Sequence, residues 1–467
     1  MTKTSPSLQR IFDQGHAVGG LARERFPGGV LITADHRHIK EALEETRMAL
    51  DSGATTIYEA AFVAADTLVR PDILIAGKRG SWNLYEVKSS GEVKDVYVQD
   101  AAVQRHVLEE SGLNVAAVCI VYINNRYLRK GPLDLAKLFT IADVSEETRH
   151  LKHEIKAKLA ELAEIAKSTT PPSTAIGPWC KAQHKCGFYE HCWKDIQDTS
   201  IHHIKHLSWD KIGQLQERGI SEISAIPEDF PLSPQQALQR LAEKDHRTLV
   251  NKSEIQKHIK RLKYPLHYLD FETISPAIPP FDDCRPMEQL PFQASLHIQD
   301  TPGSSLRHLE YLGSATEDPR PRLVDFLVKN IASSGSVIAY SKDFEGMCLK
   351  VLAEHFPSAS TPLLSIKQRL WDSAESFSRA HYVHPGFKGR WSIKKVLPVL
   401  VPDMTYAGLA VANGEDAQAA YLQLMSGKLD PEEAERLKAN LKEYCGQDTL
   451  AMVRLVEILS RAVEEGS

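Results

Sequence analysis

The chain has 467 residues, enough for two or three folded domains with sizeable hydrophobic cores. Hydrophobic residues make up 42% and charged residues 25% of the sequence, values that are typical of globular proteins and exclude collagen-like, low-complexity and disulfide-stapled chains. The formal net charge of −5 excludes a global positive field, so any binding of nucleic acid must depend on local basic patches or on metal ions.

No stretch of the sequence predicts a membrane segment. The longest apolar run, Val115–Ile123, is far shorter than the roughly 20 residues that span a bilayer. Residues 1–6 lack the apolar core of a signal peptide. We therefore expect no membrane partner and a cytoplasmic location.

Residues 1–170 predict a mixed α/β domain. Its expected elements, in chain order, are a helix over 38–50, strands over 56–62, 67–76 and 82–88, a helix over 96–110, a strand over 115–123 and a charged helix over 145–167. The breaker segment Ser168–Ser173 ends this domain. A cysteine cluster over 171–199 and a helical connector over 200–262 follow, the connector being either a spacer or a helical hairpin that holds nucleic-acid backbone.

Residues 263–467 predict a second α/β domain that begins with antiparallel strands. Its expected elements are strands over 267–272, 292–298 and 306–312, a helix over 319–332, a strand over 337–340, a helix from 344 and further helices in the carboxy-terminal part.

Three charged residues fall on two neighbouring strands of the first domain. Asp72 lies on one strand, and Glu86 and Lys88 lie two apart on the next, so that the last two side chains project from the same face. Two carboxylates hold Mg²⁺ or Mn²⁺ through oxygen, and an ammonium group orients or polarises an attacking water. Glu59 on the preceding strand would add a metal ligand, and Gln104 on the following helix would position substrate or metal-bound water.

A Glu-x-Lys tripeptide alone is an ordinary solvated pair. The ordered set Glu59, Pro71-Asp72, Glu86-Val87-Lys88 and Gln104 on αβββαβ elements, however, resembles the PD-(D/E)xK nuclease superfamily, in particular its RecB-like branch. The resemblance covers about residues 38–123. It implies a restriction-endonuclease-like fold and metal-dependent hydrolysis of phosphodiesters.

Three cysteines, Cys180, Cys186 and Cys192, lie just after this domain. Thiolates select iron–sulfur clusters or zinc, and both centres normally take four ligands. RecB-like nucleases that this segment resembles carry a [4Fe–4S] cluster on one cysteine before the nuclease core and three after it, but residues 1–58 contain no cysteine. Four explanations stay open: the chain starts late, His184 or His191 substitutes, the site holds Zn²⁺ as Cys₃His, or the three thiols are reduced and hold no metal.

Asp270 and Glu272 lie on one face of a predicted strand, and the apolar residues between and before them lie on the other. Two carboxylates two residues apart on a central strand repel each other unless cations lie between them. Near the carboxy terminus, Tyr444 and Asp448 lie four apart on one face of a predicted helix.

With the segment Ala339–Glu345 between them, these motifs resemble the DEDD exonucleases of the ribonuclease H-like fold, in the subclass that has Tyr-x₃-Asp. The resemblance implies two divalent metal ions on four carboxylates: Asp270, Glu272, Glu345 and Asp448. It also implies that Tyr444 orients the water that attacks the terminal phosphodiester. The middle motif departs from the family pattern, because Ser341 replaces Asn and Glu345 replaces Asp, with Asp343 as an alternative ligand.

The basic run that includes Lys388, Arg390 and Trp391 precedes the last motif. The two cations could contact a phosphate backbone while the tryptophan stacks on a base. A solvated, basic start of a helix is the alternative.

The stretch 268–298 closely resembles a bacterial domain family of unknown function, numbered 2779, and with Gly28-Gly-Val30 and the cysteine block the resemblance covers most of the chain. Such chains pair a RecB-like nuclease with this second domain, and an additional amino-terminal segment with Cys-Pro would supply the fourth cluster ligand. We therefore expect a metal-dependent nuclease that acts on DNA or RNA and has a 3′–5′ exonuclease module. The alternative is a non-catalytic protein that binds nucleic acid or recruits a partner.

Overall fold

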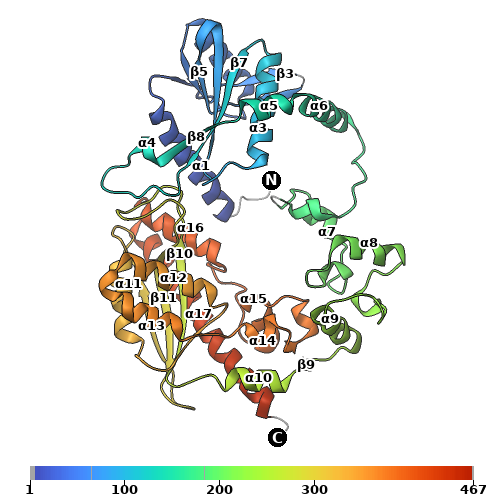
Figure 1. Ribbon diagram of the computed structural model, residues 1–467, viewed down its shortest axis with the longest axis vertical. Helices are drawn as coiled ribbons and strands as arrows, with labels where there is room; N and C mark the ends of the chain where they lie inside the picture. The colour runs from blue at the N-terminus through green and yellow to red at the C-terminus, as the bar shows by residue number, and fades with distance from the viewer. Residues whose placement is uncertain (1–5, 65, 183–184, 465–467) are drawn as a thin grey trace. The chain divides into compact units, whose positions relative to one another are not determined.

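The computed structural model describes residues 6–64, 66–182 and 185–464 (Figure 1). The chain divides into two compact units: unit 1 is Met1–Ser173 with Ser275–Glu288, and unit 2 is Thr174–Ile274 with Gln289–Ser467. The cysteine cluster and the connector therefore fall within unit 2. The mixed α/β class predicted from the sequence is confirmed. None of the described helices combines the length and apolarity needed to span a bilayer.

Unit 1 is built on a six-stranded mixed sheet in the order β1-β2-β5-β6-β7-β8. Its strands are β1 (Val30–Leu31), β2 (Thr56–Tyr58), β5 (Ile73–Ala76), β6 (Ser81–Lys88), β7 (Asn114–Ile123) and β8 (Phe139–Asp143), and a separate hairpin joins β3 (Phe62–Ala64) to β4 (Thr67–Val69). Strand β5 runs antiparallel to both of its neighbours, β2 and β6, whereas β6 and β7 run parallel.

Helices cover both faces of this sheet. They are α1 (Pro6–Arg25), α2 (Ile39–Asp51), α3 (Asp95–Glu110), α4 (Leu135–Leu138), α5 (Ser145–His150) and α6 (Lys152–Lys167). Leu74 and Leu84 share a core with α2 and α3, whereas Ile73 and Val121 share a second core with α1. Because side chains alternate along a strand, β6 directs Glu86, two residues after Leu84, to the α3 side.

Two predicted strands of unit 1 are each divided in the structure. Glu59 adopts a φ of 57° and ends β2, where a single strand had been predicted over 56–62. Pro71, which has no N–H to donate, lies between β4 and β5, where a single strand had been predicted over 67–76. Helix α1 and strands β1 and β8 were not predicted.

The segment Ser275–Glu288 belongs to unit 1 although it follows the first strand of the unit 2 sheet. Ala277 is buried in the core beneath α1. The guanidinium group of Arg129 donates to the carbonyl oxygens of Pro279 and Pro280 at 2.9 and 2.8 Å, and the Arg129 N–H donates to the Cys284 carbonyl at 3.1 Å. The acceptors are main-chain carbonyl oxygens, which every residue type has. The sequence therefore gives no sign that this segment, which it predicts within 263–467, packs in unit 1.

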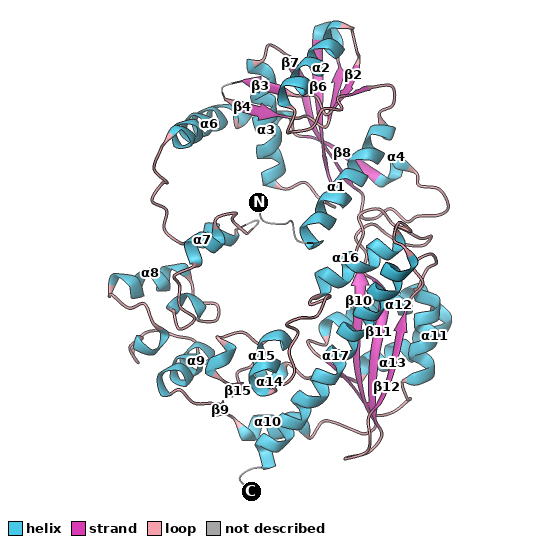
Figure 2. Cartoon of the chain, turned by 180° about the vertical axis from the view of Figure 1, so that it is seen from behind, coloured by secondary structure: helices cyan, strands magenta, loops and turns pink. Residues whose placement is uncertain are grey.

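Unit 2 is built on a five-stranded sheet in the order β12-β11-β10-β13-β14. Figure 2 labels β10, β11 and β12 of this sheet. The strands are β10 (Leu266–Ile274), β11 (Leu290–Gln299), β12 (Arg307–Leu312), β13 (Ser336–Ala339) and β14 (Leu370–Asp372). The first three are antiparallel neighbours, and β10, β13 and β14 run parallel.

Helices α11 (Arg320–Asn330), α12 (Asp343–His355) and α13 (Ser360–Gln368) pack on one face of the unit 2 sheet, and α17 (Pro431–Glu464) packs on the other. The remaining elements of unit 2 are α7 (Tyr189–Trp193), α8 (Trp209–Glu217), α9 (Pro234–Asp245), β9 (Leu249–Val250), α10 (Lys252–Ile259), α14 (Glu375–Ser378), β15 (Tyr382–Val383), α15 (Ile393–Leu400) and α16 (Gly414–Met425).

Candidate functional site

Strand β10 carries the two carboxylates at the centre of the unit 2 site. Leu269 and Phe271 point into the core formed with α11, α12 and α13, and Tyr268 points into the core formed with α17. Asp270 and Glu272 share the face of Tyr268 because side chains two apart project to the same side. The strand therefore presents both carboxylates to α17.

Helix α17 brings Asp448 to these two carboxylates. Ligand oxygens of Asp270, Glu272 and Asp448 all lie within 4.8 Å of one another, and this is the only such group of potential metal ligands among the residues that the structure describes. Glu272 and Asp448 are each only 7% exposed. Tyr444, one helical turn before Asp448, lines the same cavity of about 310 Å³. The structure thus gathers the Asp-x-Glu and Tyr-x₃-Asp motifs at one place.

Glu345 joins this site from the first turn of α12. It lines the same cavity and is 3% exposed, and its Oε2 atom has no hydrogen-bond partner among the described residues. Asp343, the alternative ligand from the sequence, is exposed and lines a different cavity. Ser341, with a φ of 68°, donates its N–H to Asp372 Oδ1 at 2.9 Å, so Asp372 supports the turn that leads into α12.

The carboxylates of this site resist ionisation in the absence of cations. Burial raises the pKa of Asp270 and Glu272 well above the usual range, and each is raised further by a neighbouring carboxylate, Asp448 for Asp270 and Asp270 for Glu272. Burial and the charge of Asp270 also raise the pKa of Glu345. Burial raises the pKa of Asp448 to about 6, although hydrogen bonds from Tyr406 and Tyr444 and the charge of Lys394 lower it. A bound divalent cation would remove this repulsion.

Two residues of this site, Lys394 and Tyr406, were missed from the sequence. Lys394 Nζ donates to the Tyr444 hydroxyl at 3.0 Å and lies 4.9 and 5.4 Å from the ring centres of Tyr444 and Tyr406. The Tyr406 hydroxyl donates to Asp448 Oδ1, and the Cys445 thiol donates to Asp270 Oδ2 at 3.4 Å. The signal for Lys394 was its place in the basic run. Tyr406 lies in a loop with no pattern to mark it.

The predicted unit 1 site brings Asp72, Glu86 and Lys88 together at adjacent ends of β5 and β6. Asp72 Oδ2 accepts a hydrogen bond from the Val87 N–H at 2.7 Å. Lys88 Nζ donates to Glu86 Oε1 at 2.8 Å and to Asp100 Oδ2 at 2.6 Å. Asp100 lies on α3, and no pattern in the sequence marks it.

Burial raises the pKa of both unit 1 carboxylates. The Glu86 charge adds to the rise at Asp72, and the Lys88 charge partly offsets the rise at Glu86. Burial lowers the pKa of Lys88, but its two ion pairs outweigh this effect and raise the value above its usual range.

Gln104 and Glu59 lie differently around this site. Gln104 is buried on α3, and its Oε1, like Glu86 Oε2, has no hydrogen-bond partner among the described residues. Glu59 Oε1 pairs with Arg23 Nη1 of α1 at 3.2 Å. The predicted metal ligand therefore already has a cationic partner, from a helix that was not predicted.

The three clustered cysteines are free thiols in the structure. Cys180 is buried, and Cys186 and Cys192 are exposed. Within the described chain they do not form a group of converging metal ligands, and neither does His191 with them. His184 lies outside the described residues. A metal at these cysteines therefore stays a prediction.

The predicted nucleic-acid contacts lie in the loop before α15. The Lys388 ammonium pairs with Asp198, and the Trp391 carbonyl accepts a hydrogen bond from the Tyr340 hydroxyl. Arg390 is exposed, and Trp391 is half-buried. Of the two predicted cations, Arg390 is the one without an ion pair among the described residues.

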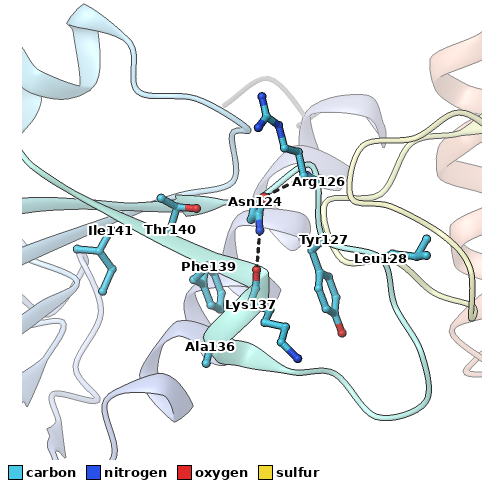
Figure 3. Close-up of a pocket in the computed structure, with 9 residues that line it drawn as sticks. All are labelled: Asn124, Arg126, Tyr127, Leu128, Ala136, Lys137, Phe139, Thr140 and Ile141. Atoms are coloured by element: carbon cyan, nitrogen blue, oxygen red, sulfur yellow. Dashed lines mark hydrogen bonds between the residues drawn. The ribbon is translucent and has the colours of Figure 1, made fainter.

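A cavity of about 620 Å³ in unit 1 lies beside β8 (Figure 3). Its lining residues include two cations, Arg126 and Lys137, whose side chains point to opposite sides. Lys137 Nζ already pairs with Asp134 Oδ2 at 2.9 Å. The cavity therefore lacks the convergent polar groups of a binding site.

Comparison with known proteins finds a family model and distant relatives that match part of the chain. The chain is 29% identical over 214 residues to the uncharacterized protein MG366 homolog of Mycoplasma pneumoniae, an alignment that covers 42% of this chain and 32% of that protein. It is 28% identical over 229 residues to the uncharacterized protein UU173 of Ureaplasma parvum, covering 44% of this chain and 32% of that protein.

The chain spans about a third of the length of these curated relatives. No solved structure matches the chain. Residues 267–392, which include Asp270, Glu272 and Glu345, match the family described as Domain of unknown function (DUF2779), so the predicted resemblance to family 2779 is confirmed for this segment.

Proposed function

We propose that unit 2 is a metal-dependent nuclease module that removes nucleotides from 3′ ends. One observation carries the proposal: the ligand oxygens of Asp270, Glu272 and Asp448 converge within 4.8 Å in a cavity that Glu345 also lines. Four carboxylates with raised pKa values fit hard divalent cations such as Mg²⁺ or Mn²⁺, which take oxygen ligands.

The residues of this site would divide the work of hydrolysis. The carboxylates would bind the cations, which supply Lewis-acid stabilisation of the charge that develops on the phosphoryl oxygens. The Tyr444 hydroxyl, held by Lys394 and next to Asp448, would orient the attacking water towards the terminal phosphodiester. The buried surroundings strengthen these electrostatic interactions.

The topology of unit 2 supports this proposal. An antiparallel start, β10-β11-β12, is followed by parallel strands β13 and β14, and the carboxylates lie on the central strand β10 and on helices next to it. This arrangement agrees with the ribonuclease H-like resemblance of the sequence motifs.

We propose a second phosphodiester-cleaving site in unit 1, at Asp72, Glu86 and Lys88. The order α2-β2-β5-β6-α3-β7 supports it, since it is the αβββαβ order of the PD-(D/E)xK resemblance once the β3–β4 hairpin is set aside. Glu86 Oε2 and Gln104 Oε1 are buried without a hydrogen-bond partner among the described residues, and a hydrated cation would satisfy them.

A structural iron–sulfur cluster or Zn²⁺ at Cys180, Cys186 and Cys192 is part of the same proposal, and the metal content of protein purified without oxygen tests it. Thiolates are the ligands that both centres take.

The nuclease proposal is tested by metal-dependent degradation of end-labelled single- and double-stranded DNA and RNA. Intact protein is compared with Asp72→Ala, Asp270→Ala and the double variant. If each single change removes a distinct pattern of products in Mg²⁺ or Mn²⁺, both sites are catalytic. If folded protein that binds Mn²⁺ cuts none of the four substrates, the non-catalytic binding function replaces the nuclease.

A further inference from the structure

A second cavity of unit 2, of about 380 Å³, is lined by lysines of α12 and α13. We call it the lysine groove. Lys342, immediately before α12, Lys350 on α12 and Lys367 on α13 contribute its ammonium groups, and Asp343 contributes a carboxylate. Because the three lysines outnumber this carboxylate, the groove is complementary to an anionic partner.

The first turn of α12 separates the lysine groove from the cavity that Asp270, Glu272 and Asp448 line, which we call the metal-site cavity. Lys342 and Gly346 line the groove, whereas Phe344 and Glu345 line the cavity that holds Asp270. Residues four apart lie on the same side of a helix, so Lys342, Gly346 and Lys350 form one row along α12. A nucleic-acid strand that left the metal site over this turn would contact the lysine row next.

Gly346 lies where α12 approaches the Lys367 side chain of α13. A Cβ atom at this position would lie 3.4 Å from Leu370 Cδ1 and 3.6 Å from Lys367 Cε. The backbone of α12 therefore approaches the Lys367 side chain closely, which brings the lysine of α13 to the row on α12.

The ammonium groups of the groove are available to a ligand. Lys342 and Lys367 have no ion-pair partner among the described residues. Lys350 pairs with Glu354 at 3.5 Å, but both side chains are more than half exposed, and exposed pairs of this kind contribute little stability. Each lysine can therefore donate to a phosphate oxygen.

Two apolar side chains lie beside these cations. Phe344 is 37% exposed and Met347 is 39% exposed, the first at the metal-site cavity and the second in the groove. Ammonium groups that follow a backbone, next to an exposed aromatic ring, are the combination by which proteins bind single strands without sequence preference.

We propose that the lysine groove binds the phosphodiester backbone of the single nucleic-acid strand whose 3′ end occupies the Asp270 cavity, with Phe344 against a base near that end. The position of the strand end rests on the proposed function. The binding of backbone to the groove rests on the lysines alone.

The test measures binding of fluorescently labelled single-stranded oligo(dT) to the full chain in EDTA, which prevents hydrolysis. The groove variant is Lys342→Gln/Lys350→Gln/Lys367→Gln. The control variant, Lys260→Gln/Lys329→Gln/Lys428→Gln, removes three exposed charges of unit 2 that line neither cavity. Thermal melting checks the fold of both, and Lys342→Gln alone serves if the triple variant does not fold.

We expect the groove variant to bind at least tenfold more weakly, and the control variant within twofold of intact protein. The slope of log K against log salt should become shallower by about 2, since each phosphate contact on a single strand contributes roughly 0.7. Equal binding by the groove and control variants, or no binding by intact protein, overturns the proposal. Hydrolysis by intact protein in Mn²⁺ is measured separately. Binding without hydrolysis would contradict the nuclease function, and hydrolysis without a binding defect in the groove variant would contradict the role of the groove.

Discussion

The Lys394 ammonium donates to the Tyr444 hydroxyl at 3.0 Å and so joins α15 to α17 at the metal site. Burial lowers the pKa of Lys394, and the charges of Asp448, Glu272 and Asp270 act in the opposite direction. The cation is therefore held inside a cluster of carboxylates, where it offsets part of their repulsion. Its neighbour Lys395 is exposed.

Replacement of Lys394 should shift the pH dependence of hydrolysis. The Lys394 charge lowers the pKa of Asp448, which is about 6, so Lys394→Met should raise that pKa and move the acid limb of kcat/KM to higher pH. We expect a loss of activity of about 10- to 100-fold at neutral pH, as for removal of a partner that orients a residue of a metal site. Lys395→Met is the matched control, and equal pH profiles for the two variants would contradict this role.

Asp270→Asn should stabilise the metal-free protein while it abolishes the part of the response to metal that depends on the unit 2 site. Removal of one buried, mutually repelling carboxylate should raise the melting temperature in EDTA by about 2–4 °C, which corresponds to roughly 1 kcal/mol for a domain of this size. Intact protein should gain further stability when Mn²⁺ is added, since the cation binds only the native state. The comparison is made in the Asp72→Ala background, which lacks the proposed unit 1 site. In that background, an Asp270→Asn variant that still gains stability with Mn²⁺ would show that Asp270 is not a ligand.

Glu345 and Asp343 should differ in their effect on activity. Glu345 is buried in the metal-site cavity and Asp343 is exposed outside it, so Glu345→Gln should reduce hydrolysis by 100-fold or more and Asp343→Asn by less than threefold. Product formation from a 5′-labelled oligonucleotide in Mn²⁺ measures both. A larger loss in the Asp343 variant would assign the middle motif to that residue.

Lys88→Met should remove only the products that depend on unit 1. The Lys88 ammonium contacts both Glu86 and Asp100, and its loss leaves buried Glu86 without a cationic partner. We expect the Asp72-dependent products to disappear while trimming of 3′ ends continues. Circular dichroism of the variant checks that unit 1 stays folded, and loss of both activities would argue against two independent sites.

Buried His297 should make unit 2 sensitive to acid. Burial, with the charge of His308, lowers the pKa of His297 to about 4, from an ordinary value near 6.5. Between pH 4 and 6.5, His297 is protonated in the unfolded chain but neutral in the native protein. The contribution of neutral His297 to the free energy of unfolding is therefore complete above pH 6.5 and is lost as the pH falls towards 4. His297→Gln should reduce the decrease in the free energy of unfolding at acid pH by on the order of 1–2 kcal/mol. Urea titrations at several pH values measure this decrease. His206→Asn, at an exposed histidine, should leave the loss unchanged.

Local patterns in the sequence predicted the elements that carry the site. Alternation along β10 placed Asp270 and Glu272 on one face, and the four-residue spacing placed Tyr444 with Asp448 on α17. These predictions need only the period of a strand or a helix. The sequence left Asp343 and Glu345 as alternatives, because the side chain that reaches the cavity depends on where α12 begins.

Contacts between distant segments account for what the sequence missed. Tyr406 reaches Asp448, and Arg23 pairs with Glu59, through packing that no local period records. Likewise, Asp100 becomes a partner of Lys88 only when α3 packs on the sheet.

The segment Ser275–Glu288 has a consequence for the order in which the protein matures. A ribosome adds this segment only after strand β10, with Asp270 and Glu272, has been made, so the core of unit 1 lacks Ala277 and the Arg129 loop lacks its carbonyl partners until then. A nascent chain that ends at Ser173 is therefore an incomplete unit 1. The two units are synthesised as interleaved parts of one chain, which no single cut separates into complete halves.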